Sequence, residues 1–198
     1  MTGDQQGFGK GCHLHLIDGS AFIFRAYHAL PPLTRKSDGL PIGAVAGFAN
    51  MIYRYIEEAK GDDAPTHAAV IFDHSSKTFR NEIFPEYKAN RPELPEDLRP
   101  QFPLTREATR AFNIACIETE GYEADDIIAT LAAQAGAEGF ETLIITGDRD
   151  TFQLVTPSTT VLYPRKGVSD LARMTPDAVQ EKYGLTPSQY PDFAALRG

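Results

Sequence analysis

The sequence contains no tryptophan, only two cysteines (Cys12 and Cys116) and no long hydrophobic run. The two cysteines are not spaced as in a metal or redox site, and two cysteines are too few for a disulfide-stabilised scaffold. No apolar stretch approaches the roughly 20 residues that a membrane helix requires, so we expect no membrane contact. The polar, glycine-rich start lacks the apolar centre of a signal peptide. We therefore expect a flexible tail over residues 1–12 and a cytoplasmic location.

Several common catalytic patterns are also missing. No G-x-G-x-x-G follows a strand-like run, which excludes a dinucleotide-binding phosphate loop. Asp18 has no second acid two residues later, which argues against an aspartate that accepts a phosphoryl group. No serine or cysteine belongs to a recognisable nucleophile–base motif, so no side-chain nucleophile is indicated. The length of 198 residues and the 42% apolar content indicate a globular protein of one domain, or one domain and a piece of another.

The most informative feature that is present is the position of the acids. Three short apolar runs end in Asp18, Asp73 and Asp148, and such runs are typical of buried parallel strands. In an open α/β sheet, ligands bind beyond the carboxyl ends of the strands, so we expect these acids to converge. The sequence places four more acids near them: Glu123, Asp125, Asp126 and Asp150.

Seven carboxylates in one crevice would repel each other. At about 5 Å and an effective dielectric of about 20, each pair costs roughly 3 kcal/mol. Protons or divalent ions must relieve this repulsion, and a set of oxygen ligands favours Mg²⁺ or Mn²⁺. Ordinary alternatives exist for single acids: Asp73 as a turn or cap residue, and Asp125 as the N-cap of a helix.

Strand-like and helix-like segments alternate, which predicts an α/β fold with a mostly parallel sheet and helices on both faces. Between residues 74 and 103 the periodicity is poor and prolines and charges are frequent, which indicates a long functional loop or a mobile element. Threonine followed by proline, at 175–176 and 186–187, is typical of a helix start. The predicted strands are 13–18, 68–73, 114–117, 143–146 and 160–163, and the predicted helices are 21–29, 42–56, 104–112 and one that starts at 123–126.

The net charge of −8 by itself argues against a nucleic-acid partner, but the charge is uneven. Residues 120–150 contain eight acids and one base, a local charge of −7. Residues 77–91 contain four bases and two acids, a local charge of +2. The basic segment is either an ordinary solvated face or a binding surface, and charge alone favours the first.

Six motifs, taken in order, carry a resemblance to a known family. They are Leu16-Ile17-Asp18-Gly19-Ser20 followed by Phe24-Arg25-Ala26-Tyr27-His28-Ala29, Phe72-Asp73, Lys77-Thr78-Phe79-Arg80, Tyr87-Lys88-Ala89-Asn90-Arg91-Pro92, Glu123-Ala124-Asp125-Asp126, and Thr146-Gly147-Asp148-Arg149-Asp150 with Gln153-Leu154-Val155. In order and spacing, the chain from about residue 14 resembles the 5′-nuclease domains of bacterial type I DNA polymerases, which belong to the flap-endonuclease, PIN-like family. The resemblance implies a PIN-like fold and a metal-dependent 5′-3′ exonuclease or flap endonuclease that acts in DNA replication and repair.

The resemblance also implies a role for each acid. It assigns the first of two metal ions to Asp18, Asp73, Glu123, Asp125 and Asp126. Asp148 would lie between the two ions, and Asp150 would serve mainly the second. All seven acids are therefore predicted to be both metal-binding and catalytic.

The basic residues are implied to handle the DNA. Arg25 follows the first acid closely enough to reach the scissile phosphate, and residues 74–103 would form an arch or clamp over a single-stranded 5′ end. Contacts to phosphates give affinity without sequence preference, so binding is expected to weaken with salt. The predicted DNA-binding residues are Arg25, Lys77, Arg80, Tyr87, Lys88 and Arg91.

In the family, the last helix is followed by a Gly-Asp-x-x-Asp-Asn motif that supplies two more metal-binding aspartates, and then by a DNA-gripping helical region. Both would fall beyond Gly198, as would polymerase domains, so we expect an N-terminal fragment whose second ion is weakened. Its nuclease core would span 13–174 and an incomplete helical region 175–198. We expect a monomer at the bacterial nucleoid that acts on DNA flaps, nicks or single-stranded 5′ ends. A folded but catalytically impaired DNA-binding fragment and a PIN-type ribonuclease remain as alternatives.

Overall fold

The computed structural model describes residues 11–61, 64–166 and 170–197, so most of the predicted tail lies outside the described residues. Six strands form a sheet in the order β3-β2-β1-β4-β5-β6. The pairs β1–β4, β2–β3 and β4–β5 are parallel, and β5–β6 is antiparallel, which confirms the prediction of an α/β fold with a mostly parallel sheet. The strands are β1 (His13–Asp18), β2 (His67–Ile71), β3 (Ala115–Ile117), β4 (Glu141–Ile145), β5 (Thr159–Lys166) and β6 (Asp170–Met174).

The chain divides into two compact units. One comprises Met1–Ile17, Lys60–Ala68 and Ile128–Gly198, and the other comprises Asp18–Ala59 and Ala69–Ile127. We call them the β4–β6 unit and the arch unit. Each has its own buried apolar residues, and each is described separately below.

The β4–β6 unit holds β1, β4, β5 and β6, with Ile17 of β1 paired in register with Ile145 of β4. Leu16, Ile17, Ile144 and Val161 are fully buried, as expected for strands without a solvent face. Its helical elements are most of α5 (Ala124–Ala137), η2 (Arg149–Leu154), α6 (Pro176–Tyr183), η3 (Pro187–Gln189) and α7 (Tyr190–Arg197).

Both threonine–proline helix starts form as the sequence predicts. The Thr175 side chain accepts a hydrogen bond from Ala178 N, with Pro176 in the first turn. Thr186 forms a capping box with Gln189, but only the three residues of η3 follow it before α7 begins. The predicted single helix from 187 is therefore a short 3₁₀ turn followed by an α-helix.

The arch unit holds the end of β2, β3 and four helices. Gln101 Oε1 accepts hydrogen bonds from Ala44 N and Val45 N, at 2.8 and 3.2 Å. It thereby satisfies two backbone N–H groups that have no partner within the helix beginning at Gly43. Phe48 and Phe72 are fully buried and in ring contact. The helices are α1 (Gly19–Ala29), α2 (Gly43–Glu58), α3 (Phe79–Ile83) and α4 (Gln101–Ala111).

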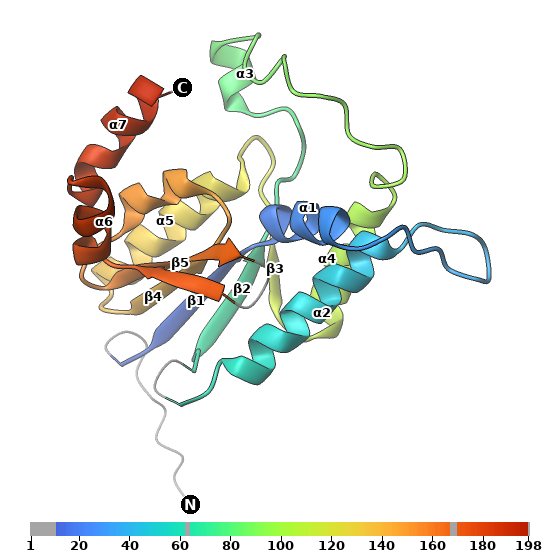
Figure 1. The fold of residues 1–198 in the computed structure, drawn as a ribbon, viewed down its shortest axis with the longest axis horizontal. Helices are drawn as coiled ribbons and strands as arrows, with labels where there is room; N and C mark the ends of the chain where they lie inside the picture. The colour runs from blue at the N-terminus through green and yellow to red at the C-terminus, as the bar shows by residue number, and fades with distance from the viewer. Residues whose placement is uncertain (1–10, 62–63, 167–169, 198) are drawn as a thin grey trace, which may run out of the picture. The chain divides into compact units, whose positions relative to one another are not determined.

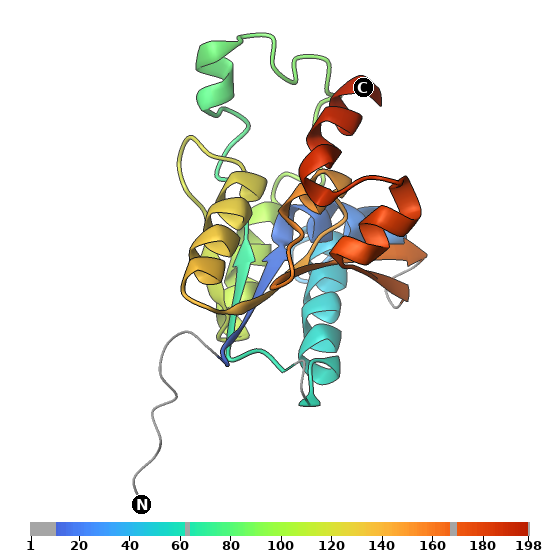
Figure 2. The ribbon, with the colours of Figure 1, turned by 90° about the vertical axis from the view of Figure 1, so that its left-hand side faces the viewer.

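The long segment predicted as irregular is largely so, but it contains one short helix. Figures 1 and 2 show α3 standing apart from α1, α2 and α4, with an extended stretch leading from it to α4. The helix predicted at 104–112 begins earlier, at Gln101, because the buried Gln101 side chain packs against the start of α2. Strand β6 was not predicted, although it pairs with β5 as a local hairpin in which Lys166 lies opposite Asp170, because the mixed apolar and charged residues of Asp170–Met174 give no clear strand pattern.

The membrane prediction concerns the helices. Within the described ranges, no helix is both long enough and apolar enough to cross a membrane.

Candidate functional site

Asp18 is held at the junction of β1 and α1. Leu16 and Ile17 before it are fully buried, so the strand reaches the surface at this residue. One carboxylate oxygen accepts a hydrogen bond from Ala21 N at 2.9 Å, which makes Asp18 the N-cap of α1. The predicted metal ligand is thus also a structural cap.

Asp73 joins the end of β2 to the start of α5. Its Oδ1 accepts a hydrogen bond from Ala124 N at 2.7 Å, across 51 residues of sequence. The bond satisfies one of the free N–H groups of the first turn of α5. Asp73 is therefore a cap residue, as in the ordinary alternative, but it caps a helix that is distant in sequence. This contact places Asp73 beside the acidic turn Glu123–Asp126.

The backbone of Asp73 is also held, by two residues that sequence reasoning missed. Its N–H donates to Ser20 Oγ at 3.2 Å, and its carbonyl accepts from Arg106 Nη2 at 2.7 Å. Ser20 was visible only as part of a motif, and nothing in the pattern around Arg106 distinguishes it from a surface arginine of α4.

Glu123 and Asp126 are both paired with bases of the long segment 74–103. The two Nη atoms of Arg80 donate to the two carboxylate oxygens of Asp126 at 2.7 Å each. Lys88 Nζ donates to both carboxylate oxygens of Glu123 at 2.7 Å, and Tyr87 Oη donates to one of them at 3.3 Å. Three predicted DNA-binding residues therefore lie on two predicted metal ligands.

The carboxylates of the acidic turn lie in different electrostatic environments, and their pKa values shift in different directions. Hydrogen bonds from Arg80 lower the pKa of Asp126, which also accepts a hydrogen bond from Glu123 N. Asp125 lies in the first turn of α5, after the cap position. The surrounding protein desolvates its carboxylate, and the charges of Asp126 and Glu123 add to this, so the pKa of Asp125 is raised. A raised pKa marks Asp125 as the acid with the least compensated charge in this turn.

Asp148 and Asp150 belong to the β4–β6 unit. Asp148 caps η2 by accepting a hydrogen bond from Asp150 N at 2.9 Å, and its own N–H donates to Thr146 Oγ1. Partial desolvation and the nearby charge of Asp148 raise the pKa of Asp150. The two acids form a local pair, and their convergence with the five acids of the arch unit stays a prediction.

The remaining predicted DNA-binding residues are more open. Lys77 and Arg91 are exposed on the long segment, and Arg25 is half-buried on α1. Lys88 has a positive φ of 58°, a left-handed backbone conformation that is unusual for a lysine. Such strain tends to persist where the surrounding contacts over-determine it, here the pairing with Glu123.

The predicted acids have the ligand chemistry that a divalent ion needs, but their side chains are not arranged as a metal site. In the described part of the chain, no three His, Cys, Asp or Glu side chains are grouped so as to hold a metal ion. Carboxylates are nevertheless the hard oxygen donors that Mg²⁺ and Mn²⁺ prefer. Two of the five acids in the arch unit, Glu123 and Asp126, would have to exchange a basic partner for the metal.

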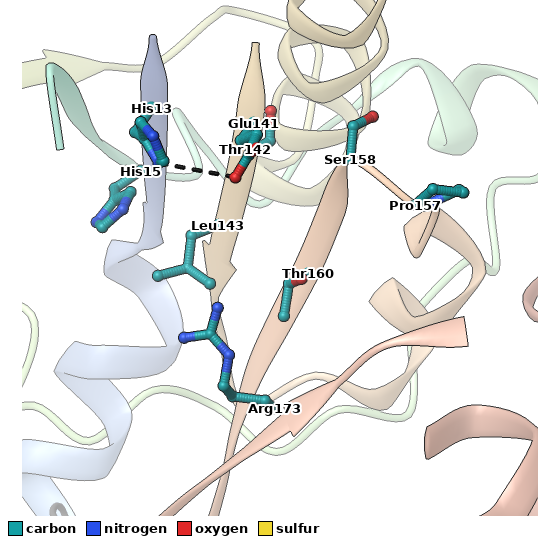
Figure 3. Close-up of a pocket in the computed structure, with 9 residues that line it drawn as sticks. All are labelled: His13, His15, Glu141, Thr142, Leu143, Pro157, Ser158, Thr160 and Arg173. Carbon is teal, nitrogen blue, oxygen red and sulfur yellow. Dashed lines mark ion pairs between the residues drawn. The ribbon is translucent and has the colours of Figure 1, made fainter. Parts of the chain in front are cut away.

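A polar pocket of the β4–β6 unit lies elsewhere. Figure 3 shows it at the amino ends of β1 and β4, where His13 and Glu141 approach within 3.9 Å and Arg173 of β6 reaches toward Leu143. It contains none of the predicted acids. The residues lining it are His13, His15, Glu141, Thr142, Leu143, Pro157, Ser158, Thr160 and Arg173.

Sequence comparison relates most of the chain to one family. Residues 13–184 match the profile of the 5′-3′ exonuclease, N-terminal resolvase-like domain. DNA polymerase I of Rhizobium leguminosarum is 55% identical over 192 residues, which is 96% of this chain and 18% of that protein. DNA polymerase I of Mycobacterium tuberculosis H37Rv is 53% identical over 186 residues, 93% of this chain and 20% of that protein. The chain thus spans about a fifth of the length of these relatives.

Solved structures share the fold at low sequence identity. The T5 5′-exonuclease with bound divalent zinc ions superposes with a TM-score of 0.65 and 20% identity, covering 90% of this chain and 64% of that chain. The bacteriophage T5 flap endonuclease, in a pseudo-enzyme–product complex with DNA and metal ions, gives a TM-score of 0.63 and 17% identity, covering 89% and 62%. These similarities establish the fold.

Proposed function

Because the chain belongs to the 5′-3′ exonuclease, N-terminal resolvase-like domain family, we propose that it hydrolyses DNA phosphodiesters near 5′ ends with the help of divalent metal ions. The observation that carries the proposal is the hydrogen bond from Ala124 N to Asp73 Oδ1. It brings the acid at the end of β2 against the turn that carries Glu123, Asp125 and Asp126. The carboxylate of Asp73 thereby joins the helix start that carries three further acids, and this concentration of negative charge favours a cation.

The proposal assigns the acids to two Mg²⁺ or Mn²⁺ ions. Bound there, the ions would supply an activated water and neutralise charge on the phosphate. The first ion would be held by Asp18, Asp73, Glu123, Asp125 and Asp126, with Asp148 shared between the ions and Asp150 serving the second. Since fewer of these carboxylates serve the second ion, we expect it to bind more weakly.

The basic residues are proposed to bind the DNA backbone. Lys77 and Arg91 are exposed and ready to contact phosphates, whereas Arg80 and Lys88 must first leave their carboxylates. Arg25 would contact the scissile phosphate, and Tyr87 would stack on a base of the single strand. Substrates would be 5′ flaps, nicks and single-stranded 5′ ends.

The relatives support a proposal about the setting in which the chain works. We propose that the chain works as a monomer in the bacterial cytoplasm at the nucleoid, with polymerase domains in the same longer natural chain, as in the polymerases it resembles. A second candidate is a DNA-binding module without cleavage. The ion pairs that occupy Glu123 and Asp126 favour this alternative, because they compete with the metal.

Cleavage of a 5′-labelled DNA flap tests the proposal. We expect cleavage that requires Mg²⁺ or Mn²⁺, and flap binding that weakens more than about tenfold between 50 and 200 mM salt, since several phosphate contacts release counterions. An RNA flap of the same sequence serves as the comparison. Binding without cleavage at any metal concentration would select the non-catalytic alternative, and cleavage of the RNA alone would select a PIN-type ribonuclease.

Replacing Lys88 with Met is expected to tighten Mn²⁺ binding about fivefold. The variant removes a cation that lies 2.7 Å from both oxygens of Glu123 and leaves that nearly buried carboxylate only the more distant Arg80, at 4.0 Å, so a metal ion meets less competition for it. The free Mn²⁺ signal in an EPR titration reports the affinity, with the exposed Lys36→Met as a matched control. Equal affinity in the two variants would remove Glu123 from the metal site.

A further inference from the structure

Asp73 is fixed by three hydrogen bonds, and Phe72 just before it by a fourth, to four different elements. Its carboxylate accepts from Ala124 N of α5, its N–H donates to Ser20 Oγ of α1, and its carbonyl accepts from Arg106 of α4. Phe72 N, just before it, donates to the Ile117 carbonyl at the end of β3.

Arg106 is the most constrained of these partners. Its side chain is 13% exposed, and its guanidinium uses three different nitrogens. Nη2 donates to the Asp73 carbonyl at 2.7 Å, Nε donates to Glu118 Oε2 at 2.7 Å, and Nη1 donates to the Phe102 carbonyl at 3.1 Å. Its guanidinium carbon also lies 4.7 Å from the centre of the Phe72 ring. The planar fork is therefore locked in one orientation.

The Arg106–Asp73 bond also closes the base of the long segment. The segment leaves the sheet directly after Asp73 and returns at α4, and Arg106 ties α4 back to the carbonyl of Asp73 across 33 residues. Motion of the segment would otherwise act directly on the peptide that carries the carboxylate. The guanidinium thus holds Asp73 in place when the segment that follows it changes conformation.

We infer that Arg106, oriented by Glu118, is a positioning residue for the carboxylate of Asp73, an inference that rests on the proposed role of Asp73 as a metal ligand. The hydrogen bonds of Arg106 go to the Asp73 carbonyl, Glu118 and the Phe102 carbonyl, and none goes to the Asp73 carboxylate. Arg106 acts through the Asp73 backbone and through Phe72. Groups that orient metal ligands from outside typically change metal affinity about 10- to 100-fold when they are removed.

Lysine at position 106 tests the geometry rather than the charge. A lysine keeps the positive charge but has one nitrogen, so it cannot hold the Asp73 carbonyl, Glu118 and the Phe102 carbonyl in the same fork. The matched control is Arg110→Lys, which makes the same change at an exposed position of the same helix. Glu118→Gln removes the charge that orients the guanidinium and leaves Arg106 in place.

The experiment is a Mn²⁺ titration by EPR on the full chain, with Asp73→Asn as the reference, and with circular dichroism confirming that each variant is folded at the temperature used. We expect Asp73→Asn and Arg106→Lys each to weaken Mn²⁺ binding about tenfold or more, Glu118→Gln to weaken it less, and Arg110→Lys to leave it unchanged. Weakened binding in Asp73→Asn with wild-type affinity in a folded Arg106→Lys would overturn the inference and leave the proposed function standing. Wild-type affinity in Asp73→Asn would refute the metal assignment of Asp73 itself, and the inference with it.

Discussion

Replacing Asp125 with Asn is expected to abolish cleavage of a DNA flap, by at least about 100-fold, while the chain stays folded and at least as stable as the wild type. A metal ligand lost from a two-ion site removes charge stabilisation that exists mainly in the transition state. The fold does not need the charge, because the local bond from Asp126 N to Asp125 Oδ1 at 2.8 Å can be accepted by an asparagine oxygen.

The stability half of this expectation follows from the raised pKa of Asp125. A carboxyl group with a raised pKa holds its proton more tightly in the folded than in the unfolded chain, so its ionisation at neutral pH weakens the fold. Neutral asparagine removes the cost of desolvating the charge and the repulsion from Asp126 and Glu123, and with them this penalty. The penalty is absent below the unfolded pKa and appears as the pH rises through the raised value.

Single-turnover cleavage and thermal unfolding, measured on the same preparation, check both halves. The control is Glu120→Gln, which neutralises an exposed acid five residues earlier and is expected to keep wild-type activity. Undiminished turnover in Asp125→Asn would take Asp125 out of the site. Lost turnover together with a collapsed melting transition would mean that the carboxylate supports the fold instead.

Replacing Gly19 with Ala is expected to destabilise the fold by about 2 kcal/mol, although alanine favours helices. A Cβ at Gly19 would lie 2.7 Å from Phe72 Cδ1 and 2.8 Å from Val70 Cγ1, closer than carbon atoms approach. Phe72 is fully buried between Phe48 and Arg106, so its ring has no free direction in which to move. The overpacking would be transmitted along β2 toward Asp73.

Urea unfolding of Gly19→Ala beside Gly136→Ala separates packing from helix propensity. A Cβ at Gly136, inside α5, would meet only Ser158 Oγ at 3.9 Å, so this variant is expected to gain about 0.5–1 kcal/mol. Phe72→Leu should restore part of the stability of Gly19→Ala, because it removes the clashing ring atoms. A Gly19→Ala variant as stable as Gly136→Ala would show that α1 and β2 are not in the tight contact described.

The ion pairs of Arg80 and Lys88 bear on how the chain would begin a reaction. Each base holds a carboxylate that the proposed mechanism needs for metal, and each is needed in turn for DNA phosphates. A metal ion that takes Glu123 and Asp126 would release both bases for the substrate. We therefore expect metal binding and DNA binding to favour each other, as linkage requires when both displace the same contacts.

Local contacts account for what the sequence determined by itself. Apolar runs that end in aspartate marked β1, β2 and β4, and threonine–proline pairs marked the starts of α6 and η3. These signals depend on contacts within a few residues, such as the bond from Ala178 N to Thr175, so they survive in any fold that contains the segment. The resemblance to the family followed from these acids together with the basic and aromatic motifs between them, taken in order along the chain.

Only the tertiary structure decided which side chains meet. Hydrogen bonds join Arg80 to Asp126 across 46 residues of sequence, Lys88 to Glu123 across 35, and Asp73 to Ala124 across 51. Periodicity shows which face of a helix is apolar, but it does not show which distant element will face a given arginine. Arg106 therefore read as an ordinary helix residue until packing placed its guanidinium on the Asp73 carbonyl. A charged group that becomes buried must find its partner in the fold, and that partner is set by how the elements pack.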